Sequence, residues 1–206
     1  MQAMAEDLLL LARADERGLT VTAGDVDLDD VVVGEVARLR AMGAAKVTAR
    51  IVPVRVSGDA EMIRRAVRNL VDNAARHSDS AVWVSLHSDE SNAVIAVSDD
   101  GPGIPVDRRS MIFDRFSRLD VDRQRDSSGA GLGLAIAYEI ARAHGGSVSA
   151  VDGRHGGATV ELVLPLGHSS DGSEEAGSRS ECDQTVPGAA DRLDGRDPER
   201  GVDALT

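Results

Sequence analysis

Aromatic residues are scarce in this chain: they make up 2% of the 206 residues, while all hydrophobic residues together make up 42%. The core must therefore be built from Val, Leu, Ile and Ala. The single cysteine, Cys182, excludes an internal disulfide framework and a cysteine-rich zinc site. No apolar run approaches the roughly 18 residues of a membrane-spanning helix, and no signal peptide is recognisable. We therefore expect a globular domain without direct membrane contact.

Positive charge is also in short supply. The chain has 23 Lys and Arg residues against 35 Asp and Glu residues, which gives a formal net charge of −12. A general nucleic-acid binder needs a basic surface, so the balance argues against nucleic acid as a partner. It argues equally against docking on an anionic lipid surface.

The spacing of apolar residues predicts helices over residues 1–17, 27–42, 59–76 and 132–144, with Asp59 as the N-cap of the third. Alternating patterns predict β-structure over residues 47–57, 81–87, 92–98, 147–152 and 158–164, and residues 99–130 are loop-rich. This mixture predicts an α/β fold, a two-layer α/β sandwich with helices on one face of a mixed sheet.

The composition changes at residue 168. Residues 168–206 hold ten acidic and four basic residues, a local net charge of −6, and their apolar residues are isolated. Such a segment buries too little apolar surface to offset the entropy of ordering it, so we expect a disordered acidic tail. The expected domains are a helical stub over 1–18, one α/β domain over 19–167 and the tail over 168–206.

A pair of asparagines lies on the third predicted helix, in the run Asn69-Leu70-Val71-Asp72-Asn73. Because Asn69 and Asn73 are four residues apart, they share one face of that helix. Amide oxygens are neutral, hard ligands of the kind that Mg²⁺ accepts while it bridges phosphates and keeps several waters. By itself the pair is also compatible with two solvated side chains.

The run Asp99-Asp100-Gly101-Pro102-Gly103 follows a predicted strand. A carboxylate at this point can accept a hydrogen bond from the exocyclic amino group of adenine. The glycines permit unusual backbone angles and a close approach of a ligand to the chain. A plain turn is the alternative interpretation of this motif alone.

Two further motifs follow, Ile112-Phe113-Asp114-Arg115-Phe116 and Gly129-Ala130-Gly131-Leu132-Gly133-Leu134. Residues 117–128, between these two motifs, are charged and contain hardly any apolar side chains. This composition fits a flexible lid over bound nucleotide. Glycines that open a helix leave backbone N–H groups free to bind an anion. The pattern is not a Walker P-loop, because the P-loop lysine is missing.

In this order, the four motifs resemble the N, G1, F and G2 boxes of the ATP-binding domain of sensor histidine kinases, which belongs to the GHKL or Bergerat-fold ATPase superfamily with DNA gyrase, Hsp90 and MutL. The resemblance covers roughly residues 20–166. Residues 5–13 resemble the end of the second dimerisation helix of such kinases.

The resemblance implies ATP and Mg²⁺ as cofactors, with Asn73 as the Mg²⁺ ligand and Asn69 beside it at the phosphates. It implies that Asp99 selects adenine. We also expect Arg115 or Arg118 to reach the γ-phosphate, because a guanidinium group matches phosphate oxygens in a bidentate way. The other nucleotide contacts expected from the resemblance are His77, Gly101, Gly103, Ile104, Phe116, Gly129, Gly131, Leu132, Gly133 and Leu134. Asp72 should face away from the site, because a carboxylate aimed at the phosphates would weaken ATP binding.

The histidine that such a kinase phosphorylates is not recognisable. The five histidines are followed by Ser or Gly and none resembles the acceptor box. We therefore expect the ATP-binding catalytic half of a two-component kinase, with the acceptor module upstream in a longer chain or on a separate one, and a response regulator as the later recipient. The implied location is the cytoplasm, either free or as the cytoplasmic part of a membrane-bound sensor kinase. Two alternatives stay open: a non-catalytic, ATP-dependent interaction module and an anti-sigma-factor-type serine kinase.

Overall fold

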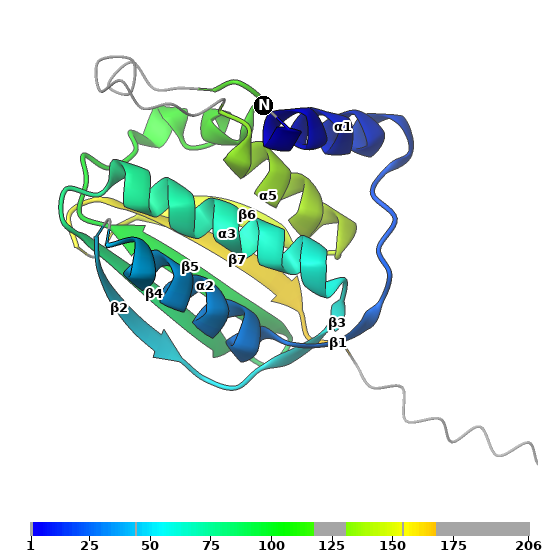
Figure 1. Cartoon of the computed structure of the whole chain (residues 1–206), viewed down its shortest axis with the longest axis horizontal. Helices are drawn as coiled ribbons and strands as arrows, with labels where there is room; N and C mark the ends of the chain where they lie inside the picture. The colour runs from blue at the N-terminus through cyan, green and yellow to red at the C-terminus, as the bar shows by residue number, and fades with distance from the viewer. Residues whose placement is uncertain (1, 44, 118–130, 154, 168–206) are drawn as a thin grey trace, which may run out of the picture. The chain divides into compact units, whose positions relative to one another are not determined.

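A computed structural model gives the structure of the chain (Figure 1). It describes residues 2–43, 45–117, 131–153 and 155–167. The predicted acidic tail and most of the predicted lid lie outside the described residues.

A five-stranded mixed sheet forms one layer of the domain, with the strand order β2-β4-β5-β7-β6. The parallel pairing of β2 with β4 and the antiparallel pairing of the other neighbours make the sheet mixed. The strands are β2 (Lys46–Ile51), β4 (Ala81–Ser88), β5 (Asn92–Asp99), β6 (Ser147–Asp152) and β7 (Ala158–Pro165). Buried and less buried residues alternate along β4 and β5, because successive side chains point to opposite faces of a sheet.

Three helices form the second layer and lie side by side over one face of this sheet (Figure 1). They are α2 (Leu28–Met42), α3 (Ala60–His77) and α5 (Gly133–Ala143). A fourth helix, α1 (Gln2–Arg17), packs against α5. The predicted two-layer α/β sandwich with helices on one face is confirmed. Within the described part of the chain, no helix has the length and hydropathy needed to cross a bilayer.

The middle helix of this layer, α3, begins where the sequence predicts. The Asp59 carboxylate accepts hydrogen bonds from the backbone N–H groups of Glu61 and Met62, both at 3.1 Å. These bonds satisfy donors that have no partner inside the helix. Beyond β5, the loop-rich region contains only two short 3₁₀ turns among its described residues, η1 (Val106–Arg108) and η2 (Met111–Phe113).

The hydrophobic core is aliphatic, as the composition predicts. Among the described residues, every buried hydrophobic side chain is Val, Leu, Ile or Ala. The core lies between the sheet and the three helices, and it includes Leu70 of α3 and Ile136 of α5, which are at most 1% exposed. The core therefore fixes the two helices that carry Asn69, Asn73, His77, Gly133 and Leu134.

The predicted β segment over residues 47–57 is divided in the structure. After β2 ends at Ile51, β3 (Arg55–Gly58) leaves the large sheet and pairs antiparallel with β1 (Gly24–Asp27). Pro53 lies at the break, where its lack of a backbone N–H group removes a donor that a continuous strand would use. Strand β1 was not predicted, because its Gly-Asp-Val-Asp sequence is too short and too acidic to show a strand pattern.

Candidate nucleotide-binding site

Helix α3 carries three of the predicted site residues at helical spacing. Asn69, Asn73 and His77 follow one another at intervals of four residues, so they lie along one side of the helix. Eight residues of helix span about 12 Å. All three side chains belong to half-buried residues. This side of α3 therefore offers an elongated surface whose two ends differ.

Asp99 lies at the end of β5 and defines one end of the site. It is 4% exposed, and its Oδ1 accepts hydrogen bonds from the backbone N–H groups of Gly101 at 2.9 Å and Ala158 at 3.2 Å. Among the described residues, no donor bonds to its Oδ2. Asp99 is thus a fixed carboxylate with one oxygen able to accept a hydrogen bond from an adenine amino group.

Two glycines let the chain pack closely around Asp99. A Cβ atom on Gly101 would lie 2.0 Å from the carbonyl oxygen of His77, and one on Gly157 would lie 2.3 Å from Asp99 Oδ1. Any side chain at either position would push the backbone apart. Gly157 was not predicted as a site residue, although the Gly156-Gly157 pair before β7 was the available signal.

Asp100 was also not predicted, and it anchors the same loop. Its carboxylate accepts a hydrogen bond from the Ser80 hydroxyl at 2.5 Å and from the backbone N–H groups of Asp79, Ser80 and Ala81 at 2.9 to 3.0 Å. The Ser80 hydroxyl and these backbone donors hold the pKa of Asp100 far below its usual range. The ionised carboxylate therefore ties the end of β5 to the turn that follows α3.

The predicted contacts Gly103 and Ile104 continue the loop after Asp100. Gly103 has a φ of 74°, a left-handed conformation that favours glycine. Ile104 is half-buried, and its carbonyl oxygen accepts a hydrogen bond from Arg109 Nε at 3.3 Å. Both residues thus belong to the loop that begins at Asp99.

The opposite end of the site lies where α5 begins. A Cβ atom on Gly133 would lie 3.5 Å from Asn69 Oδ1, so the first residue of α5 faces the N-terminal asparagine of the pair. The N-cap residue, Leu132, supplies no side-chain hydrogen bond to the first turn and is 2% exposed. Its contribution to a ligand would therefore come from its backbone. Leu134 is half-buried against the core.

Asn69 carries a polar group suited to a ligand. Its Nδ2 atom is buried and has no hydrogen-bond partner among the described residues. Buried polar groups are nearly always paired, so an exception needs an explanation. A phosphate group bound at the start of α5 would supply an acceptor, and an uncapped helix N-terminus favours an anion at the same point.

The described edges of the predicted lid are joined to each other. The Phe116 N–H group donates to the Gly131 carbonyl oxygen at 3.0 Å. Phe116 has a φ of 60° and is 59% exposed, and it is the only non-glycine residue with positive φ among the described residues. Phe113 instead packs on Tyr138, with ring centroids 6.0 Å apart. Arg118, Gly129 and residues 119–128 lie outside the described residues.

Arg115 is paired with helix α1. Its guanidinium forms two hydrogen bonds of 2.5 Å with the Asp15 carboxylate and a third of 3.2 Å with the Leu11 carbonyl oxygen, both on α1. The hydrogen bond and charge of Arg115 lower the pKa of Asp15, and Asp15 raises that of Arg115. A contact with a γ-phosphate would require Arg115 to leave these partners.

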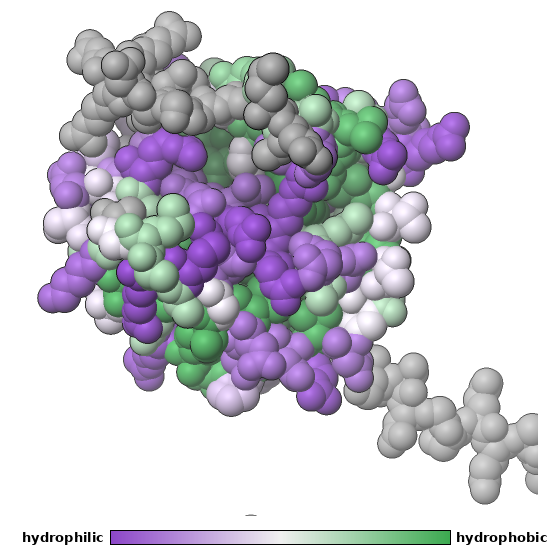
Figure 2. All heavy atoms as spheres, in the orientation of Figure 1, coloured by the Kyte–Doolittle hydropathy of each residue, from purple (hydrophilic) through white to green (hydrophobic). Residues whose placement is uncertain are grey.

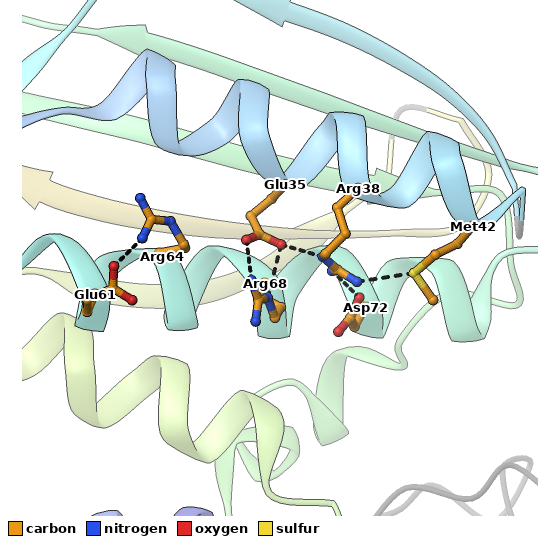
Figure 3. A network of polar contacts seen from close by, with 7 residues as sticks. All are labelled: Glu35, Arg38, Met42, Glu61, Arg64, Arg68 and Asp72. Atoms are coloured by element: carbon orange, nitrogen blue, oxygen red, sulfur yellow. Dashed lines mark hydrogen bonds and ion pairs between the residues drawn. The ribbon is translucent and has the colours of Figure 1, made fainter. Parts of the chain in front are cut away.

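Asp72 is directed toward α2, as expected from the repulsion between a carboxylate and phosphates. Its Oδ1 accepts a hydrogen bond of 2.5 Å from Arg38 on α2, so its charge is directed to the α2 side of α3 (Figure 3). No group of three or more His, Cys, Asp or Glu side chains able to hold a metal occurs among the described residues. The neutral amide oxygen of Asn73 fits a Mg²⁺ ion that takes its remaining ligands from phosphates and water.

Comparisons with known proteins identify similar chains and similar folds. The RstB sensor protein of Escherichia coli K12 is 37% identical over 173 residues, which cover 82% of this chain and 40% of that protein. The structure of the mycobacterial sensor histidine kinase MprB matches with a TM-score of 0.62 at 32% identity, covering 70% of this chain and 97% of that one. The ATP-binding domain of PrrB from Mycobacterium tuberculosis matches with a TM-score of 0.60 at 27% identity, covering 71% and 98%.

The chain spans less than half the length of the curated relatives it matches. Residues 58–168, more than half of the chain, match the family described as histidine kinase-, DNA gyrase B- and HSP90-like ATPases. This segment contains all four sequence motifs and both ends of the site. The chain therefore belongs to this ATPase family and carries the ATP-binding domain of the sensor histidine kinase type.

Proposed function

We propose that this chain provides the ATP-binding catalytic half of a two-component histidine kinase. The observation that carries the proposal is the surface along α3, which joins a fixed carboxylate, Asp99, to an uncapped helix start beside Asn69. A nucleoside triphosphate has the same division, with a base at one end and phosphates at the other. We place this domain in the cytoplasm, where ATP is available.

At the phosphate end, Asn73 would hold Mg²⁺ and Asn69 would bond a phosphate oxygen. The bound ion would offset the negative charge of the β- and γ-phosphates during transfer. The first backbone N–H groups of α5, at Gly133 and Leu134, would orient the phosphates. At the base end, Asp99 would accept the adenine amino group, while Gly101 and Gly103 let the base approach the backbone.

The proposed reaction needs a histidine from a dimerisation module. An imidazole nitrogen attacks the γ-phosphorus, the bond from that phosphorus to the β–γ bridging oxygen breaks, and ADP leaves. The phosphoryl group then passes to a response regulator. Positioning for in-line attack supplies most of the catalysis in such transfers. In this scheme Arg115 would exchange Asp15 for the γ-phosphate.

The test is to mix the full chain with a purified, histidine-containing dimerisation module of a related sensor kinase and γ-labelled ATP. We expect acid-labile label on the module, because a phosphorus–nitrogen bond hydrolyses in acid. The Asn73→Ala variant should lose Mg²⁺-dependent ATP binding and transfer. Acid-stable label would instead indicate a serine kinase. ATP binding without transfer to any module would indicate an interaction module, and full transfer by Asn73→Ala would remove the role of Asn73.

A further inference from the structure

Glu35 of α2 is a buried carboxylate that the ATP-binding residues do not contact directly. It is 3% exposed, and only two other polar or charged residues, Asp99 and Thr159, are buried in the described part of the chain. Arg68 of α3 donates two hydrogen bonds to this carboxylate, from Nε to Oε2 at 3.1 Å and from Nη2 to Oε1 at 2.9 Å. A paired contact of this kind fixes orientation as well as distance.

A second arginine extends the contact along α3. Arg38 donates from Nε to Glu35 Oε2 at 2.6 Å and from Nη2 to Asp72 Oδ1 at 2.5 Å (Figure 3). The four residues Glu35, Arg38, Arg68 and Asp72, here called the α2–α3 clamp, therefore join two turns of α3 to α2. Hydrophilic side chains gather over these two helices in the space-filling view (Figure 2).

The clamp and the asparagine pair occupy the same two turns of α3. Arg68 directly precedes Asn69, and Asp72 directly precedes Asn73. Successive residues of an α-helix are separated by about 100° around its axis. The clamp therefore holds one sector of the helix while the asparagines project from the adjacent sector. With a side-chain radius of 5–6 Å, rotating α3 by 20° would move each amide by about 2 Å.

Stability alone is a poor explanation for the clamp. Burial alone raises the pKa of Glu35, but the hydrogen bonds from Arg68 and Arg38 outweigh it and hold the pKa below its usual value. Burying the Glu35 carboxylate has a desolvation cost, although the side chains of its partners Arg68 and Arg38 stay 48% and 28% exposed, and apolar residues of similar size often stabilise a protein as well. An apolar pair would not fix the rotation of α3 about its axis. An error of 1 Å in the position of a reacting group can lower the rate about 100-fold.

We propose that Glu35 is a positioning residue for the Mg·ATP site: through Arg68, and through Arg38 and Asp72, it sets the rotation of α3 and so aims Asn69 and Asn73 at the phosphates and the metal. The clamp also directs the Asp72 charge away from those phosphates. This inference rests on the proposed Mg·ATP role of the asparagine pair.

The experiment compares ATP affinity with Mg²⁺ and in EDTA for the full chain, by calorimetry. The ratio of the two affinities isolates the metal-dependent contribution. For Glu35→Gln we expect this ratio to fall roughly tenfold, the size of effect typical of groups that orient metal ligands. The affinity in EDTA, which depends on the Asp99 end, should stay nearly unchanged. A general loss of structure would lower both affinities together.

Glu61→Gln is the matched control. Glu61 pairs with Arg64 on the same helix, and both side chains are at least 40% exposed (Figure 3). For Glu61→Gln, the ratio of the ATP affinity with Mg²⁺ to that in EDTA should equal the wild-type ratio. If Glu35→Gln does not fold, Arg68→Lys decides, because lysine keeps the charge but loses the paired geometry. A reduced ratio in the decisive variant supports the inference, and an unchanged ratio overturns it.

Asn73→Ala separates this inference from the proposed function. If Asn73→Ala removes the Mg²⁺ dependence while the Glu35 and Arg68 variants keep it, the clamp has no positioning role and the site assignment stands. If Asn73→Ala also keeps the Mg²⁺ dependence, the metal site itself is misassigned and the inference fails with it.

Discussion

The two ends of the nucleotide site differ in how tightly their residues are packed. At the Asp99 end, a strand terminus, two close-packed glycines and the Asp100 carboxylate leave almost no room for adjustment. At the Asn69 end, a Cβ atom added to Gly133 would lie at an ordinary van der Waals distance from Asn69 Oδ1, and Asn69 Nδ2 has no hydrogen-bond partner among the described residues. The first region is packed before any ligand is considered, and the second is polar and less constrained.

This difference follows from what each end would recognise. An adenine base is distinguished from other bases by the position of one amino group, so its acceptor must be fixed to within a few tenths of an ångström. Phosphates are recognised by charge and by backbone N–H groups, which tolerate small movements. The hydrogen bond between Phe116 and Gly131 joins the two residues that flank the predicted lid.

The largest predicted effect is that of Gly101→Ala at the Asp99 end, compared with Gly133→Ala at the Asn69 end. Gly101→Ala should lower the free energy of unfolding by about 3 kcal/mol and abolish ATP binding, because its Cβ would meet the His77 carbonyl oxygen at 2.0 Å. Gly133→Ala should change the free energy of unfolding by less than about 0.5 kcal/mol, because its Cβ has space. Urea denaturation and calorimetry measure both. Equal effects at the two positions would contradict the comparison.

Asp99→Asn should have the next largest effect. The amide oxygen would keep the bonds from the Gly101 and Ala158 N–H groups, so the adenine amino group would face the amide NH₂ donor, a loss of about 1–3 kcal/mol, or roughly 5- to 150-fold in ATP affinity. Affinity for a triphosphate with a non-adenine base should be unchanged. Competition binding with the two nucleotides is the measurement, and parallel losses for both would show that Asp99 does not read the base.

Asp100→Asn should have the smallest effect and should depend on pH. Because the folded-state pKa of Asp100 is lowered, its carboxylate stabilises the fold above its unfolded pKa of about 3.9, and this contribution is lost as the pH falls through the folded-state value. The variant should be less stable than the wild type at pH 7, with the difference narrowing below pH 4. Urea denaturation at several pH values tests this, and a pH-independent difference would argue against it.

Local patterns in the sequence identify much of this site. The spacing of Asn69 and Asn73, the cap at Asp59 and the position of Asp99 after a strand are properties of short segments, so they can be predicted without the fold. The aliphatic core follows from composition in the same way. The division of residues 47–57 between two sheets could not be predicted, because it depends on which neighbours each half meets.

Contacts between distant segments are the part that the sequence does not reveal. Glu35 and Arg68 are 33 residues apart, and the Ala158 N–H group that holds Asp99 is 59 residues away from it. Arg115 meets Asp15 across 100 residues. Each of these partners looks like an ordinary surface charge or turn residue until the fold brings the two segments together.

The most direct test of a two-ended ATP site is an amide NMR titration of the ¹⁵N-labelled full chain, first with adenosine and then with a non-hydrolysable Mg·ATP analogue. Adenosine should shift the backbone amides of Gly101 and Ala158 and leave those of Gly133 and Leu134 unchanged. The Mg·ATP analogue should shift both sets and the side-chain amides of Asn69 and Asn73. Shifts at the start of α5 with adenosine alone, or none there with the triphosphate, would contradict the account.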